Sequence, residues 1–309
     1  MLHAIEKAGS FAAAARALGL VPSALTYRVR QIEDALDVLL FDRSSRQARL
    51  TAAGHELLRE GERLLTDIDA IANRVKRVAT GWESQFTIAV DGIVDHTTVM
   101  ELCEAFFALN APTRLRLRHE TLTGTLQALT SGQADLALGV AGTFSGSGEA
   151  TGIQSAPIGP MRFVFAVAPQ HPLAKAPEPL SDTVIGQHRA VAVADSVQRG
   201  AGMTIGLLPG QEVFTVPSMH NKIDAQVRGL GVGFVPELRA QPWVDTGKLL
   251  LKQVERPQRV AQLSYAWRTP DGSLDERGGR ALQWWLKQLK SPATRSALLV
   301  NPRPLQPIS

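Results

Sequence analysis

Apolar residues near the N-terminus recur at helical spacing and predict three short helices, over residues 1–8, 11–18 and 22–36. In the third segment, apolar side chains follow Leu25 at i+4, i+7 and i+11 and form one inward stripe, while polar side chains occupy another face. A short helix, a turn at Gly19 and an amphipathic helix are typical of a helix-turn-helix.

The segments after the third helix predict a wing and a long pairing helix. Two strand-like pieces, 39–41 and 48–50, enclose a short polar loop, as in a wing. Residues 52–79 contain no proline, and small or apolar residues repeat at intervals of seven from Leu58 and from Gly61. A seam that repeats about every 3.5 residues predicts a helix that pairs with a second copy, so we expect dimerisation here. The alternative is a helix packed on its own chain.

Past Gly81 the pattern changes to short apolar strands that alternate with helices, which predicts parallel sheet with helical crossovers. Two α/β lobes are the simplest interpretation. The predicted elements include a helix near 201–208 and an amphipathic helix near 279–289. The proline-containing tail from residue 292 is expected to be disordered.

Composition limits the class of protein. A hydrophobic fraction of 44% with 20% charged residues is typical of a soluble globular chain. No segment approaches the roughly 18 apolar residues of a membrane span. Charged residues interrupt the N-terminal segment, whereas the apolar region of a secretory signal is uninterrupted. We therefore expect a cytoplasmic protein. A single cysteine excludes an intramolecular disulfide and a cysteine metal cage, and the histidines are scattered, so no metal site is expected. Cys103 is expected to be a buried thiol, the alternative being an oxidant-sensing thiol.

The distribution of charge is more informative than its total. A net charge of +4 is weak evidence for nucleic-acid binding. However, residues 43–49 contain three arginines and no acid. The third helix adds Arg28 and Arg30, and its acids follow at the far end. The predicted helix-turn-helix and wing therefore concentrate positive charge where DNA would bind.

A succession of local strings carries a resemblance to a known family. In order along the chain they are residues 9–11, 14–18, 23–26, 31–33, 40–43, 50–54, 132–137, 169–173 and 229–236. Their order and spacing resemble those of the LysR-type transcriptional regulators across about residues 3–290. The resemblance implies a homo-oligomeric regulator that binds promoter DNA and responds to a small molecule.

The resemblance also implies a multidomain α+β architecture. Its parts are a winged helix-turn-helix over 1–51, a linker and dimerisation helix over 52–82, an effector domain over 83–291, and a disordered tail over 292–309. The effector domain would comprise two α/β subdomains of the type-2 periplasmic-binding-protein kind, one over 83–158 and 262–291 and the other over 159–261.

Two departures from the family pattern concern the winged helix-turn-helix. The family usually has about ten more residues before the position of Met1, so either the first helix is truncated here or the start is misassigned. Val21 stands where the recognition helix usually has a serine or threonine N-cap, and Pro22 comes one place early. The loss of a capping side chain costs about 1 kcal/mol, and the base preference is expected to shift.

On this scaffold, phosphate contacts would give affinity and base contacts would give sequence preference. The wing candidates, for the backbone or the minor groove, are Arg43, Arg46 and Arg49. The candidates for the major groove are Ser23, Thr26, Tyr27, Arg28 and Arg30. For each arginine the alternative is a solvated surface charge, and Tyr27 equally suits packing against a neighbouring helix.

Two α/β lobes would place an effector cleft between the carboxyl ends of their sheets. The candidates are Asp91, Gly92, Thr121 and Thr123 from one lobe, and Asp195, Ser196, Ser218, His220, Asn221 and Phe234 from the other. Asp91 would repel an anionic effector or favour a neutral or cationic one, unless it caps its helix. His220 equally suits a structural role.

Other classes of function are less well supported. No set of nucleophile, base and oxyanion donors is visible, so we expect no enzyme, and the glycine-rich residues 229–233 lead into a strand, unlike a dinucleotide loop. We expect no cofactor beyond a small-molecule co-inducer. The expected partners are double-stranded promoter DNA, further copies in a dimer or tetramer, and RNA polymerase. The rival hypothesis is a solute-binding module whose N-terminal helices serve only for association.

Overall fold

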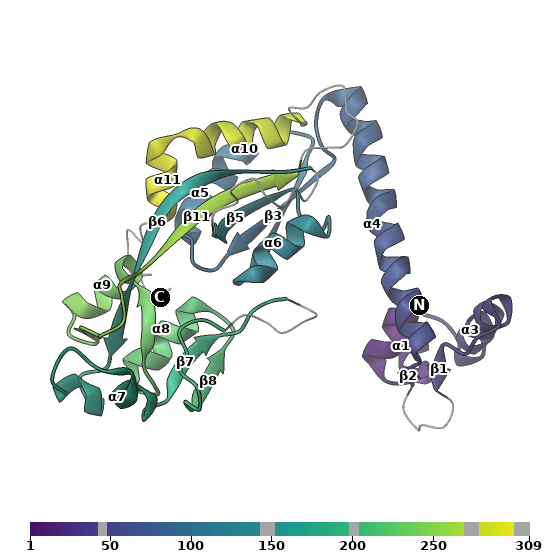
Figure 1. Ribbon diagram of the computed structural model, residues 1–309. Coiled ribbons are helices and arrows are strands. Elements are labelled where there is room, and N and C mark those ends of the chain that lie inside the picture. Colours follow the sequence, from purple (N-terminus) through teal and green to yellow (C-terminus); the bar gives the residue numbers. More distant parts are fainter. Residues whose placement is uncertain (43–47, 143–151, 198–203, 269–277, 300–309) are drawn as a thin grey trace, which may run out of the picture. The chain divides into compact units, whose positions relative to one another are not determined.

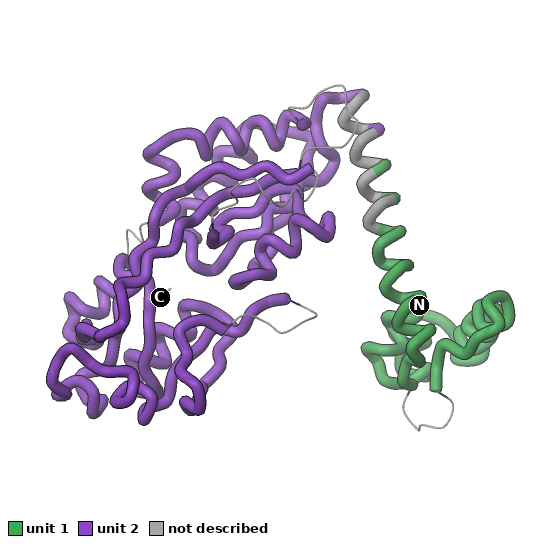
Figure 2. Tube along the Cα trace, viewed as in Figure 1, with its two compact units in different colours: residues 1–72 green, residues 73–309 purple. Residues whose placement is uncertain are grey.

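The computed structural model describes residues 1–42, 48–142, 152–197, 204–268 and 278–299. The chain forms two compact units, residues 1–72 and residues 73–309, shown in separate colours in Figure 2. None of the helices in the described ranges combines the length and hydrophobicity that crossing a membrane requires.

Three helices and a two-stranded wing surround one small core in the N-terminal unit (Figure 1). The elements are α1 Leu2–Ala8, α2 Phe11–Ala17, α3 Pro22–Leu36, β1 Phe41–Asp42 and β2 Arg49–Leu50. Ile5, Leu25 and Val29 are buried in this core, and the Phe11 and Phe41 rings meet edge to face with 5.0 Å between centroids. The helix-turn-helix and wing strands predicted from the spacing are confirmed.

A buried carboxylate fixes the base of the wing to α3. Glu33 is only 6% exposed and accepts hydrogen bonds from the backbone N–H groups of Leu40 at 2.8 Å and Phe41 at 3.3 Å. The Thr51 hydroxyl donates to the Leu39 carbonyl at 2.7 Å. The two bonds to the Glu33 carboxylate are charge-assisted and therefore stronger than neutral hydrogen bonds, so they hold β1 against the helix. Residues 43–47 of the wing, with Arg43 and Arg46, lie outside the described residues.

Helix α4, Ala52–Thr80, starts directly after the wing. Thr51 Oγ1 accepts a hydrogen bond from the Gly54 N–H at 3.0 Å. A β-carbon at Gly54 would lie 2.2 Å from the Leu40 carbonyl oxygen, so the first turn of α4 approaches the wing too closely for any side chain at that position. The helix covers the segment for which the heptad spacing predicted a pairing helix.

A mixed sheet runs through the C-terminal unit in the order β10-β6-β11-β5-β3-β4, with β9 paired to β6. The strands are β3 Gln85–Asp91, β4 Arg114–Glu120, β5 Leu136–Ala141, β6 Ile153–Val167, β9 Gly233–Pro236, β10 Leu250–Lys252 and β11 Arg259–Arg268. The β3 strand pairs in parallel with β4 and β5, whereas the other pairs are antiparallel. The long strands β6 and β11 pass through both lobes (Figure 1).

Helices cover both faces of the first lobe. The elements are α5 His96–Phe107, α6 Thr123–Thr130 and α10 Arg280–Lys290. Helices α5 and α10 enclose an aromatic core around Phe86, Phe106 and Trp285, while α6 packs on the opposite face. The buried Glu83 carboxylate accepts hydrogen bonds from the N–H groups of Ala281 and Leu282 at 3.0 and 3.3 Å, so it caps the start of α10.

The second lobe is built around a parallel pair of strands and the ends of β6 and β9. Its elements are a 3₁₀ turn at Pro172–Lys175, α7 Asp182–Gly186, β7 Ala190–Val193, β8 Val213–Val216, α8 Met219–Val227 and α9 Glu237–Asp245. Helix α8 packs against β7, β8, β9 and β6. The two predicted α/β subdomains are confirmed, although the sheet is mixed and continuous between them.

One local prediction needs correction, and some elements of the second lobe were not predicted. Residues 204–208 form no helix, contrary to the helix predicted near 201–208, whose first residues lie outside the described ranges. Helix α9 was not predicted, because Pro242 lies inside it and proline normally breaks helices. The short β10 strand was also missed.

The prediction of a disordered tail is wrong for residues 292–299, which form helix α11. Leu298 is completely buried in the core of the first lobe. Its carbonyl accepts a hydrogen bond from the Asp95 N–H at 2.8 Å, and the Ala297 carbonyl accepts one from the Thr98 hydroxyl at 3.2 Å. Burial of an apolar side chain therefore outweighs the proline-rich local composition.

Leu298→Ala should lower the free energy of unfolding of the C-terminal unit by about 2–4 kcal/mol, because it removes a fully buried leucine. Denaturant titration followed by tryptophan fluorescence measures this change. The exposed neighbour Ser296 provides the matched control, and Ser296→Ala should change stability by less than about 0.5 kcal/mol. Equal stability of the two variants would contradict the docking of α11.

Candidate DNA-binding and effector sites

The recognition helix α3 exposes a polar face opposite its buried stripe. Ser23, Tyr27 and Arg30 recur at i, i+4 and i+7 on the face opposite Leu25 and Val29, and all three are exposed. Thr26 and Arg28 border this face on either side. The structure thus presents all five predicted major-groove residues on accessible parts of one helix.

Two hydrogen bonds organise the side chains on this face. The Thr26 hydroxyl donates to the Pro22 carbonyl at 2.9 Å. The Gln31 amide donates to the Tyr27 hydroxyl at 3.1 Å, and Tyr27 is 63% exposed, so it does not pack into the core of this unit. Sequence reasoning missed Gln31, although it follows Tyr27 at i+4 and its amide has the donor and acceptor that an adenine edge requires.

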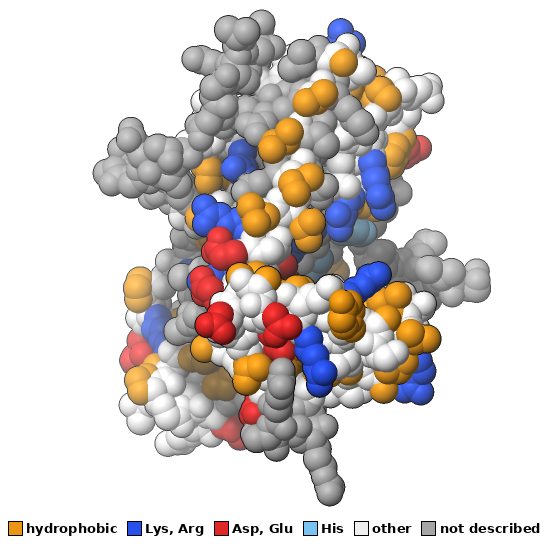
Figure 3. Space-filling view, turned by 90° about the vertical axis from the view of Figure 1, so that its right-hand side faces the viewer, with side chains coloured by type: hydrophobic (Ala, Val, Ile, Leu, Met, Phe, Trp, Pro, Cys, Tyr) orange, Lys and Arg blue, Asp and Glu red, His pale blue; other side chains and the backbone are white. Residues whose placement is uncertain are grey.

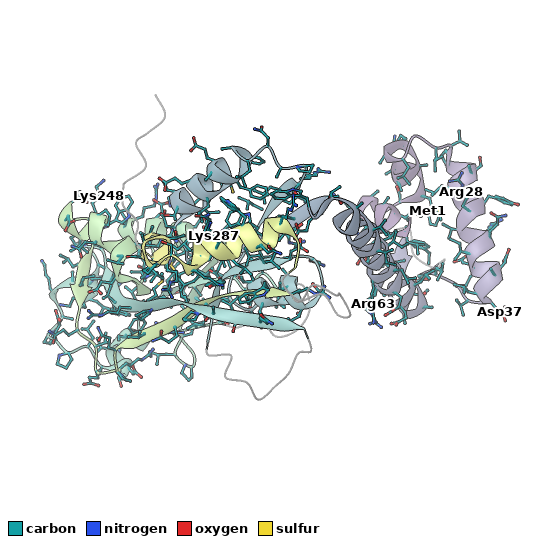
Figure 4. All side chains as sticks on the ribbon, turned by 90° about the horizontal axis from the view of Figure 1, so that it is seen from above. Met1, Arg28, Asp37, Arg63, Lys248 and Lys287 are labelled. Atoms are coloured by element: carbon teal, nitrogen blue, oxygen red, sulfur yellow. The ribbon has the colours of Figure 1, made fainter. Side chains whose placement is uncertain are left out.

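The helix start has the weak cap expected from the sequence. Val21 is the N-cap and offers no side-chain hydrogen bond, and Pro22 occupies the first turn. Arg28 lies on α3 and Asp37 directly after it, so charge changes sign along the helix (Figure 4). In the wing, Arg49 is exposed on β2.

Helix α4 exposes a long apolar stripe. Five side chains on it are 51–65% exposed: Leu64, Leu65, Ile68, Ile71 and Val75. Figure 3 shows hydrophobic side chains in a row along this helix. A row of this length on one helix face is typical of a pairing surface.

Four of the predicted effector residues join the two lobes directly. The Thr121 N–H donates to Ser196 Oγ at 2.9 Å, and the Thr121 hydroxyl donates to the Ala194 carbonyl at 2.6 Å. The Thr123 hydroxyl donates to the Asp195 carboxylate, which also accepts from the Gly124 N–H at 3.2 Å. Thr121, Thr123, Asp195 and Ser196 therefore form a hydrogen-bonded lobe contact.

Asp91 lies beside this contact but is engaged within its own lobe. Its carboxylate accepts hydrogen bonds from the N–H groups of Ile93 and Leu122, both at 2.9 Å, and from the Thr125 hydroxyl at 3.0 Å. Burial raises the pKa of Asp91 to about 7, against the opposing effects of these bonds and of Arg239. Asp91 does not cap α5, because Asp95 is the N-cap there.

Arg239 of α9 reaches across to the first lobe, where its guanidinium donates to the Gly92 carbonyl. Gly92, another predicted residue, thus belongs to a second lobe contact. Burial lowers the pKa of Arg239, while Asp95 and Asp91 raise it. Sequence reasoning missed Arg239, since an arginine in an unrecognised helix gives no signal of its partner.

The other predicted effector residues surround α8 and β9. Ser218 caps α8, accepting from the Asn221 N–H at 3.1 Å, and its hydroxyl also bonds the Asn221 side chain. His220 is exposed beside them. Phe234 meets Phe165 edge to face with 5.3 Å between ring centroids.

Two buried polar residues on α8 were also missed. Lys222 is 6% exposed and Gln226 is completely buried. Burial and the nearby Arg259 lower the pKa of Lys222 to about 8. Their signal in the sequence is a polar pair at i and i+4 beside the apolar Ile223.

Two further observations concern Cys103 and the potential metal ligands. Cys103 is buried, and burial raises the pKa of its thiol to about 11, which disfavours the reactive thiolate. Within the described ranges, no three His, Cys, Asp or Glu side chains are grouped so that they could hold a metal ion.

Comparisons with known proteins match both units. Residues 1–55 match the model of the bacterial regulatory helix-turn-helix protein of the lysR family, and residues 79–291 match the LysR substrate-binding domain. Among relatives, YeeY of Escherichia coli, an HTH-type transcriptional regulator, is 35% identical over 94% of this chain and 91% of its own. YhaJ of Escherichia coli is 33% identical over 94% of this chain and 93% of its own. The crystal structure of CbnR, a LysR family transcriptional regulator, shares the fold with a TM-score of 0.57 and 17% identity, covering 96% of each chain.

The fold and the exposed recognition helix define a helix-turn-helix transcriptional regulator with a substrate-binding domain. The chain belongs to the LysR family of these regulators. The family resemblance carried by the local strings is confirmed.

The pKa of Lys222 predicts a dependence of stability on pH. The folded chain releases this proton near pH 8, whereas the unfolded chain keeps it until the ordinary lysine pKa of 10.5, so the unfolded state binds more protons between these values. The free energy of unfolding should therefore rise across this range by about 3 kcal/mol and be lowest below about pH 8.

Lys222→Met should abolish this rise and be more stable than the original protein at about pH 7, because it removes a buried charge. Denaturant titrations between about pH 7 and about pH 10 measure both effects. Lys175→Met, at an exposed lysine of the same lobe, is the control and should keep the rise. Parallel pH profiles for Lys222→Met and the original protein would show that Lys222 titrates normally.

Proposed function

We propose that this regulator binds double-stranded promoter DNA in the bacterial cytoplasm as a homodimer or homotetramer, and that a small-molecule co-inducer acting between the lobes controls it. The observation that carries the proposal is the exposed polar face of α3. The helix is also fixed to the base of the wing through Glu33. The chain acts in this proposal as a regulator without enzymatic activity, and RNA polymerase is its further partner.

On DNA, α3 enters the major groove and the wing contacts the backbone. Ser23, Tyr27 and Arg30 face the base edges, and Thr26 and Arg28 border them. Arg43, Arg46 and Arg49 neutralise phosphates, with one of them entering the minor groove. The solute-binding alternative does not account for a recognition helix that leaves this polar face free.

The apolar stripe of α4 pairs two copies. Leu65, Ile68 and Val75 would be costly to leave in water along three helical turns, and a second α4 offers the complementary surface. Pairing would also raise the affinity for DNA, because the two helix-turn-helix domains of a dimer bind two half-sites at once.

The effector acts where the lobes meet. Thr121, Thr123, Asp195 and Ser196 close one contact, and Arg239 with Gly92 closes the other. A ligand that exchanges these bonds for its own changes the closure of the lobes, because it binds the two arrangements with different free energies. Ser218, His220, Asn221 and Phe234 are its further contacts in the second lobe.

The Arg30→Ala, Arg43→Ala double variant should bind DNA from directly upstream of the protein's own gene at least about tenfold more weakly than the original protein. Removal of one base contact costs about 1–3 kcal/mol, and removal of a phosphate contact lowers the salt dependence by about one unit of slope. Gel shifts at several salt concentrations measure both quantities. Arg114→Ala, at an exposed arginine of β4, is the matched control. Equal weak binding by the original protein and the double variant would refute the assignment.

A Leu65→Asp, Ile68→Asp variant should lose the dimer while both units stay folded, because buried carboxylates in a paired seam are strongly unfavourable. Light scattering after size-exclusion chromatography gives the mass, and circular dichroism checks the fold. Arg63→Asp places the same residue on the exposed polar face of α4 and should stay dimeric. A variant that keeps the full oligomeric mass would exclude α4 as the pairing surface.

A further inference from the structure

The second lobe buries polar groups that it does not pair. Lys222 and Gln226 lie one turn apart on α8, and Gln226 is completely buried. Both amide atoms of Gln226 lack a hydrogen-bond partner among the described residues. Nearly all buried polar side chains in folded proteins are hydrogen bonded, so an amide left unpaired on both atoms calls for a ligand.

The two side chains converge on Gly233 of β9. A β-carbon at this position would lie 3.3 Å from Gln226 Nε2 and 3.5 Å from Lys222 Nζ. The Val191 carbonyl oxygen lies at 3.5 Å from the same point. Two nitrogen donors from α8 therefore reach one location above β9, where residue 233 contributes no side chain.

Arg259 adds a second positive charge. It lowers the pKa of Lys222, and its guanidinium lies over the Phe163 ring at 5.6 Å from the centroid. Its Nη1 atom and the Phe234 ring both border Gly206. Among the described residues, no carboxylate forms an ion pair with Lys222 or Arg259. An ammonium group buried without a counter-charge is strongly destabilising, and a bound anion would remove that penalty.

We propose that Lys222 and Gln226 form an anion-binding subsite, with Arg259 adding positive charge nearby, and that the effector carries a carboxylate. The inference rests on the proposed function, since it names the chemical class of the molecule that the second lobe senses. The two oxygens of a carboxylate accept hydrogen bonds from Lys222 Nζ and Gln226 Nε2, a charge-assisted arrangement.

The subsite continues the predicted effector site inward. Ser218 caps α8 and Lys222 follows one turn later, so the buried ammonium group lies one helical turn from a predicted effector residue. Asp91 does not oppose an anion here, because its carboxylate is engaged by three hydrogen bonds in the other lobe. Its pKa near 7 also leaves it partly uncharged at neutral pH.

Thermal unfolding of the full chain in sodium acetate tests the subsite, with acetamide as the uncharged isostere and sodium chloride to hold ionic strength. Acetate should raise the Tm of the original protein by about 2 °C or more, whereas acetamide should not. Lys222→Met should raise the Tm without acetate and abolish the acetate response. A purely structural role for Lys222 would lower the Tm instead.

Two further variants complete the test. Gln226→Leu keeps the buried volume, so it should remain folded and weaken the acetate response. Lys175→Met, at an exposed lysine of the same lobe, should respond as the original protein does. An acetate response equal in Lys222→Met and the original protein, or one no larger than that to acetamide, would overturn the inference. Loss of DNA binding with an intact acetate response would contradict the proposed function alone.

Discussion

The antiparallel pairing of β6 with β11 is the constraint on which the C-terminal unit depends. The two strands stay paired from Ile153 and Arg268 in the first lobe to Phe163 and Arg259 in the second. Both lobes are therefore built on the same two strands. A change in the bend of this ladder moves Thr121 relative to Ser196 and Gly92 relative to Arg239, since each pair has one member on either side.

The ladder contains irregularities that suit it to bending. Its register shifts between Leu263 and Ser264 against β6, and between Ser264 and Tyr265 against β5. Bulges of this kind bend strands and increase their twist. In β5 the unpaired residue is Gly139, with φ +89°, and a β-carbon there would lie 2.8 Å from the Asp91 β-carbon. The glycine thus serves two purposes, because it allows the bulge and leaves room for the buried carboxylate beside the lobe contact.

The sequence predicted those parts of the structure that follow from periodicity. The helix-turn-helix, the wing strands, α4 and the two α/β lobes all have a repeating apolar pattern, which local burial explains. It failed for α11, where Leu298 is buried by contacts with residues about 200 positions away, and for α9, where Pro242 argues locally against a helix. The site shows the same division. Thr121 and Ser196 were identified because they follow strands, whereas Arg239, Lys222 and Gln226 depend on partners distant in sequence, such as Gly92 and Gly233.

The two ends of the recognition helix α3 are stabilised to different degrees. Its start has Val21 as N-cap without a side-chain hydrogen bond, while Glu33 near its end accepts two backbone hydrogen bonds from the wing. The end of the helix is therefore fixed to β1, and its first turn, which carries Ser23, is held mainly by packing of Leu25. A helix start without a capping side chain leaves backbone N–H groups without that partner, which lowers the stability of the first turn. The atypical start therefore makes the first turn of α3 less stable than the end of the helix, which stays fixed to the wing.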